Sequence, residues 1–324
     1  MTNDVYYLTS FRHLKISDEI EGHVELIPGV NITNDLTVKR RFLTPEFTNV
    51  AGTIETRYLE QAGNLVFGEF ECSDLKGRPP EAFLIAIVMW ISDLFKNAWL
   101  LKDHAMECDA VILRAPVPEG LGWFTNFLAV HPTFADGGRW IEIEMSSSEL
   151  QVWSGKHDQV EAYLHKANSG SWSTFMMGKG YSRLGRALQF INAARSAPNA
   201  AFKLAHYCSA LETLFTTEST ELAHKLSERV AFFLEQGGYN RRVIFTTVKA
   251  AYNVRSKLVH GDTLKQSQVE QLQTLNGSCD DYLRTTINTI FDSEMLRGIF
   301  DADNSIIEDY FSRLILGEPP RDTS

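Results

Sequence analysis

The spacing of apolar residues changes once along this chain, and this change constrains the fold more than any other feature. Beyond about residue 178, apolar residues recur every three or four positions, for example at Leu184, Leu188 and Ile191, as on one face of an α-helix. Before residue 170, β-branched and aromatic residues form short runs such as 65–71, which are typical of strands. We therefore predict an α+β protein. It has a strand-rich mixed N-terminal domain over 1–170, an all-α helical bundle over 178–295, and a C-terminal helix with an acidic tail over 296–324.

Capping and stop signals place the helices of the second half. Pro198 ends the first helix, and Asn199 is a suitable N-cap for the second, because the Asn side-chain oxygen accepts hydrogen bonds from free backbone N–H groups. Two glycines after Gln236 stop the third helix. These signals predict a Gly-rich linker over 170–180, a helix after Asn199, a helix over 220–236, a helix after Asn240 and a long helix over 267–291.

The N-terminal half contains one long apolar segment, 82–101, which we predict to be a buried amphipathic helix. Asp93 and Lys96 interrupt it, and each charge at bilayer depth would cost about 3 kcal/mol, so a membrane-spanning helix is disfavoured. The chain also opens without a basic leader and apolar run, which predicts a cytoplasmic protein with no membrane partner. The first 80 residues are expected to form strands and turns, and the candidate strands are 23–27, 65–71, 110–114 and 140–144.

The four cysteines lie far apart, and none has a second Cys or a His at a zinc-binding spacing. We expect reduced thiols. His104, Glu107 and Cys108 lie close together, but no second pair of ligands accompanies them, so a metal site there is disfavoured. The prediction is that the protein uses no metal and no cofactor.

The formal net charge of −10 is unevenly distributed. Residues 178–292 carry 14 Lys and Arg against 10 Asp and Glu, whereas residues 293–324 carry 3 against 7. The helical segment is therefore mildly basic, which permits contact with phosphates, and the acidity belongs to the N-terminal half and the tail.

The candidate catalytic residues are Arg255 and His260, at the end of the fourth predicted helix and directly before Gly261. Arginine stays charged and holds phosphate oxygens with a two-pronged fork, and histidine titrates near neutral pH and can act as base or acid. The spacing of Arg255 and His260 alone is weak evidence for a catalytic pair. The position of the pair at the end of an amphipathic helix within a bundle strengthens this interpretation.

Three segments in order resemble the HEPN superfamily, and more narrowly its Apea-like group. They are 210–215 (ALETLF), 221–230 (ELAHKLSERV) and 251–261 (AYNVRSKLVHG). The resemblance covers about a third of the chain, from about residue 182 to 291. It implies a helical domain whose Arg255 and His260 cut RNA without a metal, and a homodimer in which two copies of the pair line one cleft. In this interpretation Ser256 contacts phosphate or holds the arginine, and Glu212 orients Arg255 or His260.

RNA supplies its own nucleophile, the 2′-hydroxyl beside the scissile phosphate, so the reaction needs a base, an acid and positive charge at the phosphate. The expected products are a 2′,3′-cyclic phosphate and a free 5′-hydroxyl. By the same resemblance the biological role is phage defence or toxicity, with transfer RNA or another structured RNA as substrate. The acidic N-terminal domain would then respond to a protein or phage trigger.

Several alternatives remain open at this stage. The helical bundle could be a non-catalytic module that dimerises or binds a nucleotide, with an N-terminal domain that senses a small ligand or polysaccharide. His260 could be a helix-end histidine that interacts with the helix dipole, and Arg255 a surface ion-pair partner. Glu212 could pair with Arg229 instead. Tyr252, His224 and Lys225 are expected to be packing or solvated residues.

Overall fold

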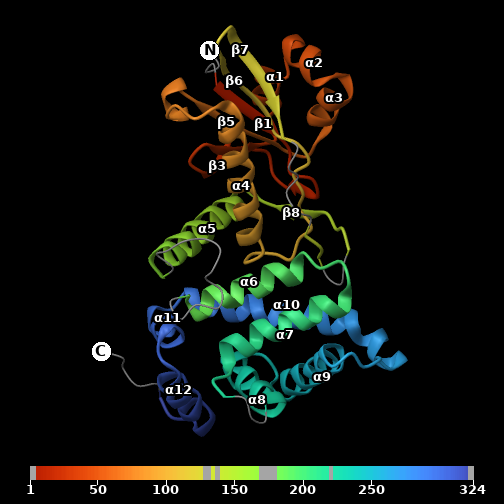
Figure 1. Cartoon of the computed structure of the whole chain (residues 1–324), viewed down its shortest axis with the longest axis vertical. Coiled ribbons are helices and arrows are strands. Elements are labelled where there is room, and N and C mark those ends of the chain that lie inside the picture. Colours follow the sequence, from red (N-terminus) through yellow and green to blue (C-terminus); the bar gives the residue numbers. More distant parts are fainter. Residues whose placement is uncertain (1–4, 127–132, 136–138, 168–180, 219–221, 320–324) are drawn as a thin grey trace. The chain divides into compact units, whose positions relative to one another are not determined.

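The computed structural model describes residues 5–126, 133–135, 139–167, 181–218 and 222–319, and it confirms the α+β class. The chain forms two compact units (Figure 1). The first contains residues 1–133 and 140–158, and the second contains 134–139 and 159–324. The division therefore falls inside helix α5 (Ser147–Ala167), earlier than the expected boundary at residue 170, and the expected linker over 170–180 lies outside the described residues.

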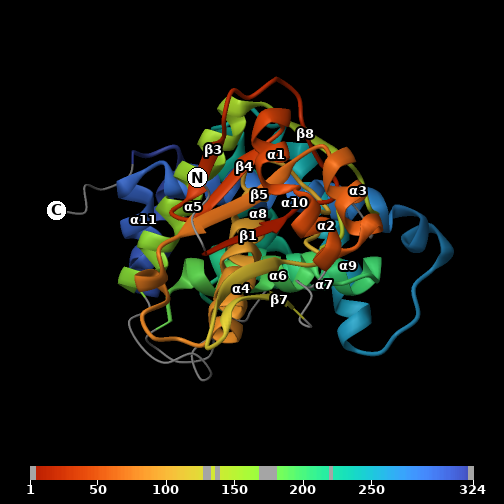
Figure 2. The same ribbon diagram turned by 90° about the horizontal axis from the view of Figure 1, so that it is seen from above.

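The first unit is built on a six-stranded antiparallel sheet in the order β3-β4-β5-β1-β6-β7 (Figure 2). Every residue of β1 is buried, as expected for a central strand that is covered on both faces. A two-stranded parallel sheet lies apart from it. The strands are β1 (Val5–Thr9), β2 (Leu14–Ile16), β3 (Val24–Ile27), β4 (Val30–Thr33), β5 (Leu65–Phe70), β6 (Ile112–Val117), β7 (Gly120–Thr125) and β8 (Ile143–Met145).

Alternate residues of β1 point to two separate apolar cores. Val5 and Tyr7 belong to the larger core, which α4 (Pro80–Ala98) and the start of α5 complete, with Trp153 fully buried. Tyr6 and Leu8 belong to a smaller core under three short helices, α1 (Leu36–Phe42), α2 (Pro45–Ala51) and α3 (Thr53–Gln61). A single 3-10 turn, η1 (Cys72–Leu75), precedes α4. No helix among the described residues is long and apolar enough to cross a membrane.

The three short helices correct the expectation that the first 80 residues form strands and turns only. These helices begin at residues of the kinds that also form turns: Asp35 is the N-cap of α1, and its carboxylate accepts from the backbone N–H of Thr37 at 2.7 Å. Thr44 caps α2, which begins with Pro45 at a position where the missing N–H costs nothing. Turn-forming and helix-capping residues are the same types, so these signals predicted the wrong element.

The regular elements that the structure describes in the second unit are helices, as predicted, and the caps expected at Asn199 and Asn240 both accept hydrogen bonds from the first turns of their helices. Helix α7 lies at its centre, packed on α6, α9 and α10, and α8 packs on α9. The helices are α6 (Arg183–Arg195), α7 (Ala200–Phe215), α8 (Leu222–Glu235), α9 (Arg241–Val259), α10 (Gln266–Phe291), α11 (Glu294–Asp301) and α12 (Asn304–Leu316).

The segment after residue 295 contains parts of two helices, not the single one expected. Ser293 caps α11, and Ala302 separates it from α12. Both helices pack into the unit, because Phe300 and Phe311 form an aromatic cluster with Phe215 and Phe233.

Gly261 ends α9 in the way the sequence predicted. Its φ of +74° is left-handed, its N–H bonds to the carbonyl of Leu258 at 3.1 Å, and the N–H of Asp262 bonds to the carbonyl of Lys257 at 2.8 Å. These two bonds are those of a Schellman motif, which satisfies the last carbonyls of the helix and turns the chain sharply.

We expect Gly261→Ala to lower the free energy of unfolding of the second unit by about 1–2 kcal/mol, measured by urea denaturation. No atom lies within 4 Å of the added Cβ, so the left-handed backbone accounts for the whole loss. The control is Gly298→Ala in α11, which also adds a Cβ in open space but at an ordinary helical φ, and which should be neutral or slightly stabilising. Equal destabilisation by both substitutions would contradict this account.

Candidate functional site

Arg255 is held by Glu212, which lies on the neighbouring helix α7. Its Nη2 lies 3.0 Å from Oε2 of Glu212, and the side chains are 24% and 17% exposed. The guanidinium also lies 5.4 Å from the ring centroid of Tyr252, one turn earlier on α9. Both contacts restrict the arginine without enclosing it, so part of its fork faces outward.

The structure decides between the two partners that the sequence left open for Glu212. Arg229 is engaged elsewhere: it bonds to the carbonyl of Phe215 at 2.9 Å and to Glu308 at 2.6 Å, and it lies over the ring of Phe311. Arg229 therefore anchors α12 onto α8, and Glu212 belongs with Arg255.

His260 is the C-cap of α9 and is exposed. Its backbone N–H bonds to Ser256, and its imidazole makes no hydrogen bond or ion pair with any described residue. The side chain of Ser256, half-buried one turn earlier, is likewise unbonded within the described part of the chain. Both groups are therefore available to a ligand.

The four candidate residues do not converge within one chain. Each helical residue rotates the chain by about 100°, so Arg255 and His260 leave α9 about 140° apart. Ser256 and His260, by contrast, share a narrow face of α9 with Lys249, within an arc of about 40°. The structure thus pairs Arg255 with Glu212 and places His260 on an adjacent face with Ser256 and Lys249.

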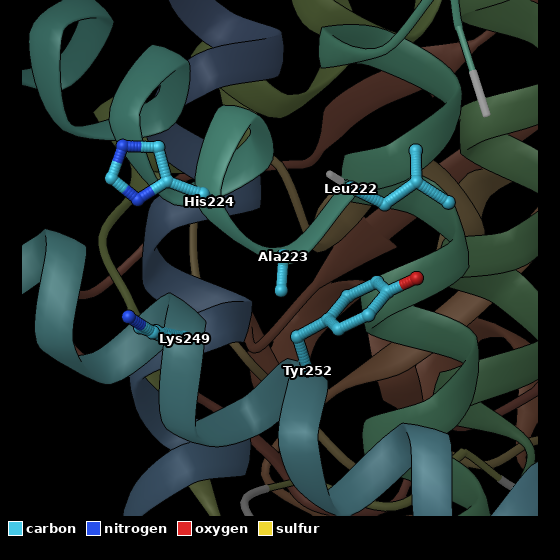
Figure 3. Close-up of a pocket in the computed structure, with 5 residues that line it drawn as sticks. All are labelled: Leu222, Ala223, His224, Lys249 and Tyr252. Atoms are coloured by element: carbon cyan, nitrogen blue, oxygen red, sulfur yellow. The ribbon is translucent and has the colours of Figure 1, made fainter. Parts of the chain in front are cut away.

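A hollow of about 680 Å³ opens beside this face, between α8 and α9. His224 from α8 and Lys249 from α9 lie on one side of it, and the ring of Tyr252 lies on the other (Figure 3). Leu222 and Ala223 complete the lining. The hollow offers one cation, one imidazole and one aromatic face, which are groups that contact phosphates and bases.

His224 and Tyr252 line the hollow, whereas the sequence predicted only packing or solvated residues at these positions. His224 packs edge-on against Phe245, whose ring Lys249 also contacts, and both His224 and Lys249 border the hollow. Burial, and then the nearby Glu212, raises the pKa of the Tyr252 hydroxyl. Lys225 instead pairs with Glu218 at 2.6 Å, as expected of a solvated residue. The sequence did contain a signal for this side of α9. Steps of three and four residues connect Lys249, Tyr252, Ser256 and His260.

His104, for which the sequence disfavoured a metal-binding role, has a structural one. His104 is fully buried, its Nε2 bonds to the carbonyl of Phe95 at 2.8 Å, and its Nδ1 accepts from the backbone N–H of Met106. Within the described ranges, no group of three or more His, Cys, Asp or Glu side chains is arranged to hold a metal ion. All four cysteines are free, and Cys108, Cys208 and Cys279 are buried.

The chain matches no protein-family model, and neither curated proteins nor solved structures show significant similarity to it.

Proposed function

We propose that the helical unit is a metal-independent endoribonuclease in which Arg255 and His260 act on the scissile phosphate. The observation that carries the proposal is the partly exposed Arg255, bonded to Glu212 at 3.0 Å, on the same helix end as an exposed His260 that is unbonded among the described residues. An arginine of this kind can offer its remaining N–H groups to phosphate oxygens, and a free imidazole can move a proton.

In the proposed reaction the 2′-oxygen attacks the adjacent phosphorus, and the bond from phosphorus to the 5′-oxygen breaks. One imidazole takes the proton of the 2′-hydroxyl, and an imidazolium gives a proton to the departing 5′-oxygen. Arg255 stabilises the charge that builds on the phosphate oxygens. Lys249 and Ser256, on the same face as His260, are suited to hold the neighbouring backbone phosphates.

A homodimer fits this geometry better than a single chain. Arg255 and His260 leave α9 about 140° apart, so one copy presents them in different directions. Two copies related by a two-fold axis would supply two of each and allow the His260 of one copy to act as base while the other acts as acid. The proposed setting is the cytoplasm, in a defence or toxin system that acts on transfer RNA or another structured RNA, with the acidic N-terminal unit controlling the helical one.

One observation favours a second candidate function. Glu212 already neutralises Arg255, which is also what a purely structural ion pair would look like. In that alternative the helical unit is a non-catalytic module for dimerisation or nucleotide binding, and its partner is recognised through the exposed face of α9.

The purified chain is expected to cut a 5′-labelled oligoribonucleotide into fragments that end in 2′,3′-cyclic phosphate. Addition of EDTA should change the rate by less than about twofold, because His and Arg supply acid, base and charge without a metal. Product ends can be assigned by mass spectrometry. An oligonucleotide with a 2′-deoxy sugar at the cleavage position is the control and should remain intact. Cleavage of that control, or loss of activity in EDTA, would contradict the mechanism.

A further inference from the structure

A second hollow, of about 440 Å³, lies within the first unit, where α3 passes over the end of β1 and the start of β6. Its walls are mostly apolar: Leu8 and Leu59 are buried at the base, and Ile54 and Ile112 stand at the sides. This volume and this lining are typical of sites that enclose a small organic molecule.

Hydrogen bonds hold one side of the hollow in place. The backbone of Arg12 pairs with that of Glu107, with its N–H bonded to the Glu107 carbonyl at 2.9 Å. The hydroxyl of Thr9 bonds to the carbonyl of Ala110 at 2.6 Å. These bonds hold the chain after β1 against residues 107–110 on one side of the hollow, which reduces the ordering that binding there would require.

Two large side chains at the rim are unusually exposed. Ile54 is 80% exposed and Tyr58 is 41% exposed, although both are on the side of α3 that borders the hollow. A bound molecule would cover apolar surface that now faces water, and it would find one flat aromatic ring at the entrance.

The charges at the hollow favour a cation. Arg12 is the one cationic side chain among the described residues of the lining, and Asp109 already engages it at 3.1 Å. Glu55 also lines the hollow, in the first turn of α3, and it has no ionic partner among the described residues. The lining therefore carries one carboxylate without an ionic partner, at the N-terminal end of α3 and three residues before Tyr58 on the same helix, and an ammonium group is attracted both by a carboxylate and by the face of an aromatic ring.

We propose that this hollow is a binding site for a small organic cation, an amine on an apolar or aromatic body of about ten to fifteen non-hydrogen atoms. The amine would lie against Glu55 and Tyr58, and the apolar body would rest on Ile54, Leu59 and Ile112. Such a site gives the first unit a ligand-recognition role, and it does not depend on the proposed nuclease activity of the helical unit.

The test uses three probes that differ mainly in charge: tyramine, neutral 4-ethylphenol and anionic 4-hydroxyphenylacetate, titrated into the full chain by calorimetry. Tyramine should bind at least about fivefold more tightly than either of the others. Glu55→Gln should remove this preference, whereas Glu60→Gln, on the same helix but outside the hollow, should change the tyramine Kd by less than about twofold.

A second variant guards against indirect effects of Glu55→Gln on the first turn of α3. Ile54→Arg alters a side chain that is already exposed, so the fold should persist while the new cation fills the hollow and abolishes tyramine binding. The proposal is overturned if tyramine shows no saturable binding below about 10 mM, if the neutral probe binds equally well, or if Glu60→Gln acts like Glu55→Gln.

Discussion

Replacement of His260 by alanine is expected to lower the rate of RNA cleavage by about two to four orders of magnitude, the usual contribution of a general acid–base group. The imidazole is exposed and unbonded, so its removal takes away a proton carrier without disturbing the packing of α9. The rate should be measured under single-turnover conditions with saturating protein, and circular dichroism and size-exclusion chromatography should show an unchanged fold and oligomeric state.

The chain provides a matched control for this substitution. His165 is also an exposed histidine in the last turn of a long helix, α5, and its interaction with the helix dipole is of the same kind. His165→Ala should therefore leave the cleavage rate within about twofold of the wild type. If His260→Ala cuts RNA as fast as the wild type while both remain folded, the nuclease proposal fails.

Arg255→Lys is expected to reduce kcat/KM by about ten- to a hundredfold, although the charge and the ion pair with Glu212 can both persist. Lysine offers a point charge in place of a planar fork, so it cannot bond to Glu212 and to two phosphate oxygens in one fixed geometry. Arg255→Ala should be slower still. It should also destabilise the second unit by about 1–2 kcal/mol, because Glu212 is only 17% exposed and would lose its partner.

Kinetics on a short oligoribonucleotide and urea denaturation separate these two effects. Arg242→Lys is the control, because Arg242 is exposed near the start of the same helix and makes no ion pair within the described ranges. That swap should change neither measurement appreciably. Full activity of Arg255→Lys would indicate that only the charge at position 255 matters and would support a structural or simple binding role.

The sequence predicted the helices of the second unit well because several independent signals agreed. For α9, the Asn240 cap predicted the start, the apolar spacing predicted the helical body and Gly261 predicted the end. The helix spans Arg241–Val259. Helices α1 to α3 were missed, since each has at most nine residues and so too few turns for a clear period. Their N-cap residues were the one useful signal, and these residues also form turns.

Only part of the candidate site could be predicted from the sequence. Arg255 and His260 lie on one helix, so their spacing could be read directly. The pairing of Arg255 with Glu212, however, joins residues 43 positions apart and depends on how α7 packs on α9. From sequence alone, Arg229 was an equal candidate for the partner of Glu212. The actual partner of Arg229 is Glu308 on α12, which lies outside the three segments that resemble the HEPN superfamily.

The central position of β1 has a consequence for the order in which this protein is made. Val5–Thr9 leaves the ribosome before both of its neighbours in the sheet, residues 65–70 and 112–117. At ordinary elongation rates, about 5 to 20 s pass before the second neighbour has been synthesised. During that interval a strongly β-forming segment, VYYLT, has an unpaired edge, which is the condition under which nascent chains aggregate. Strand β1 is therefore exposed to pairing with other chains until residues 112–117 have been made.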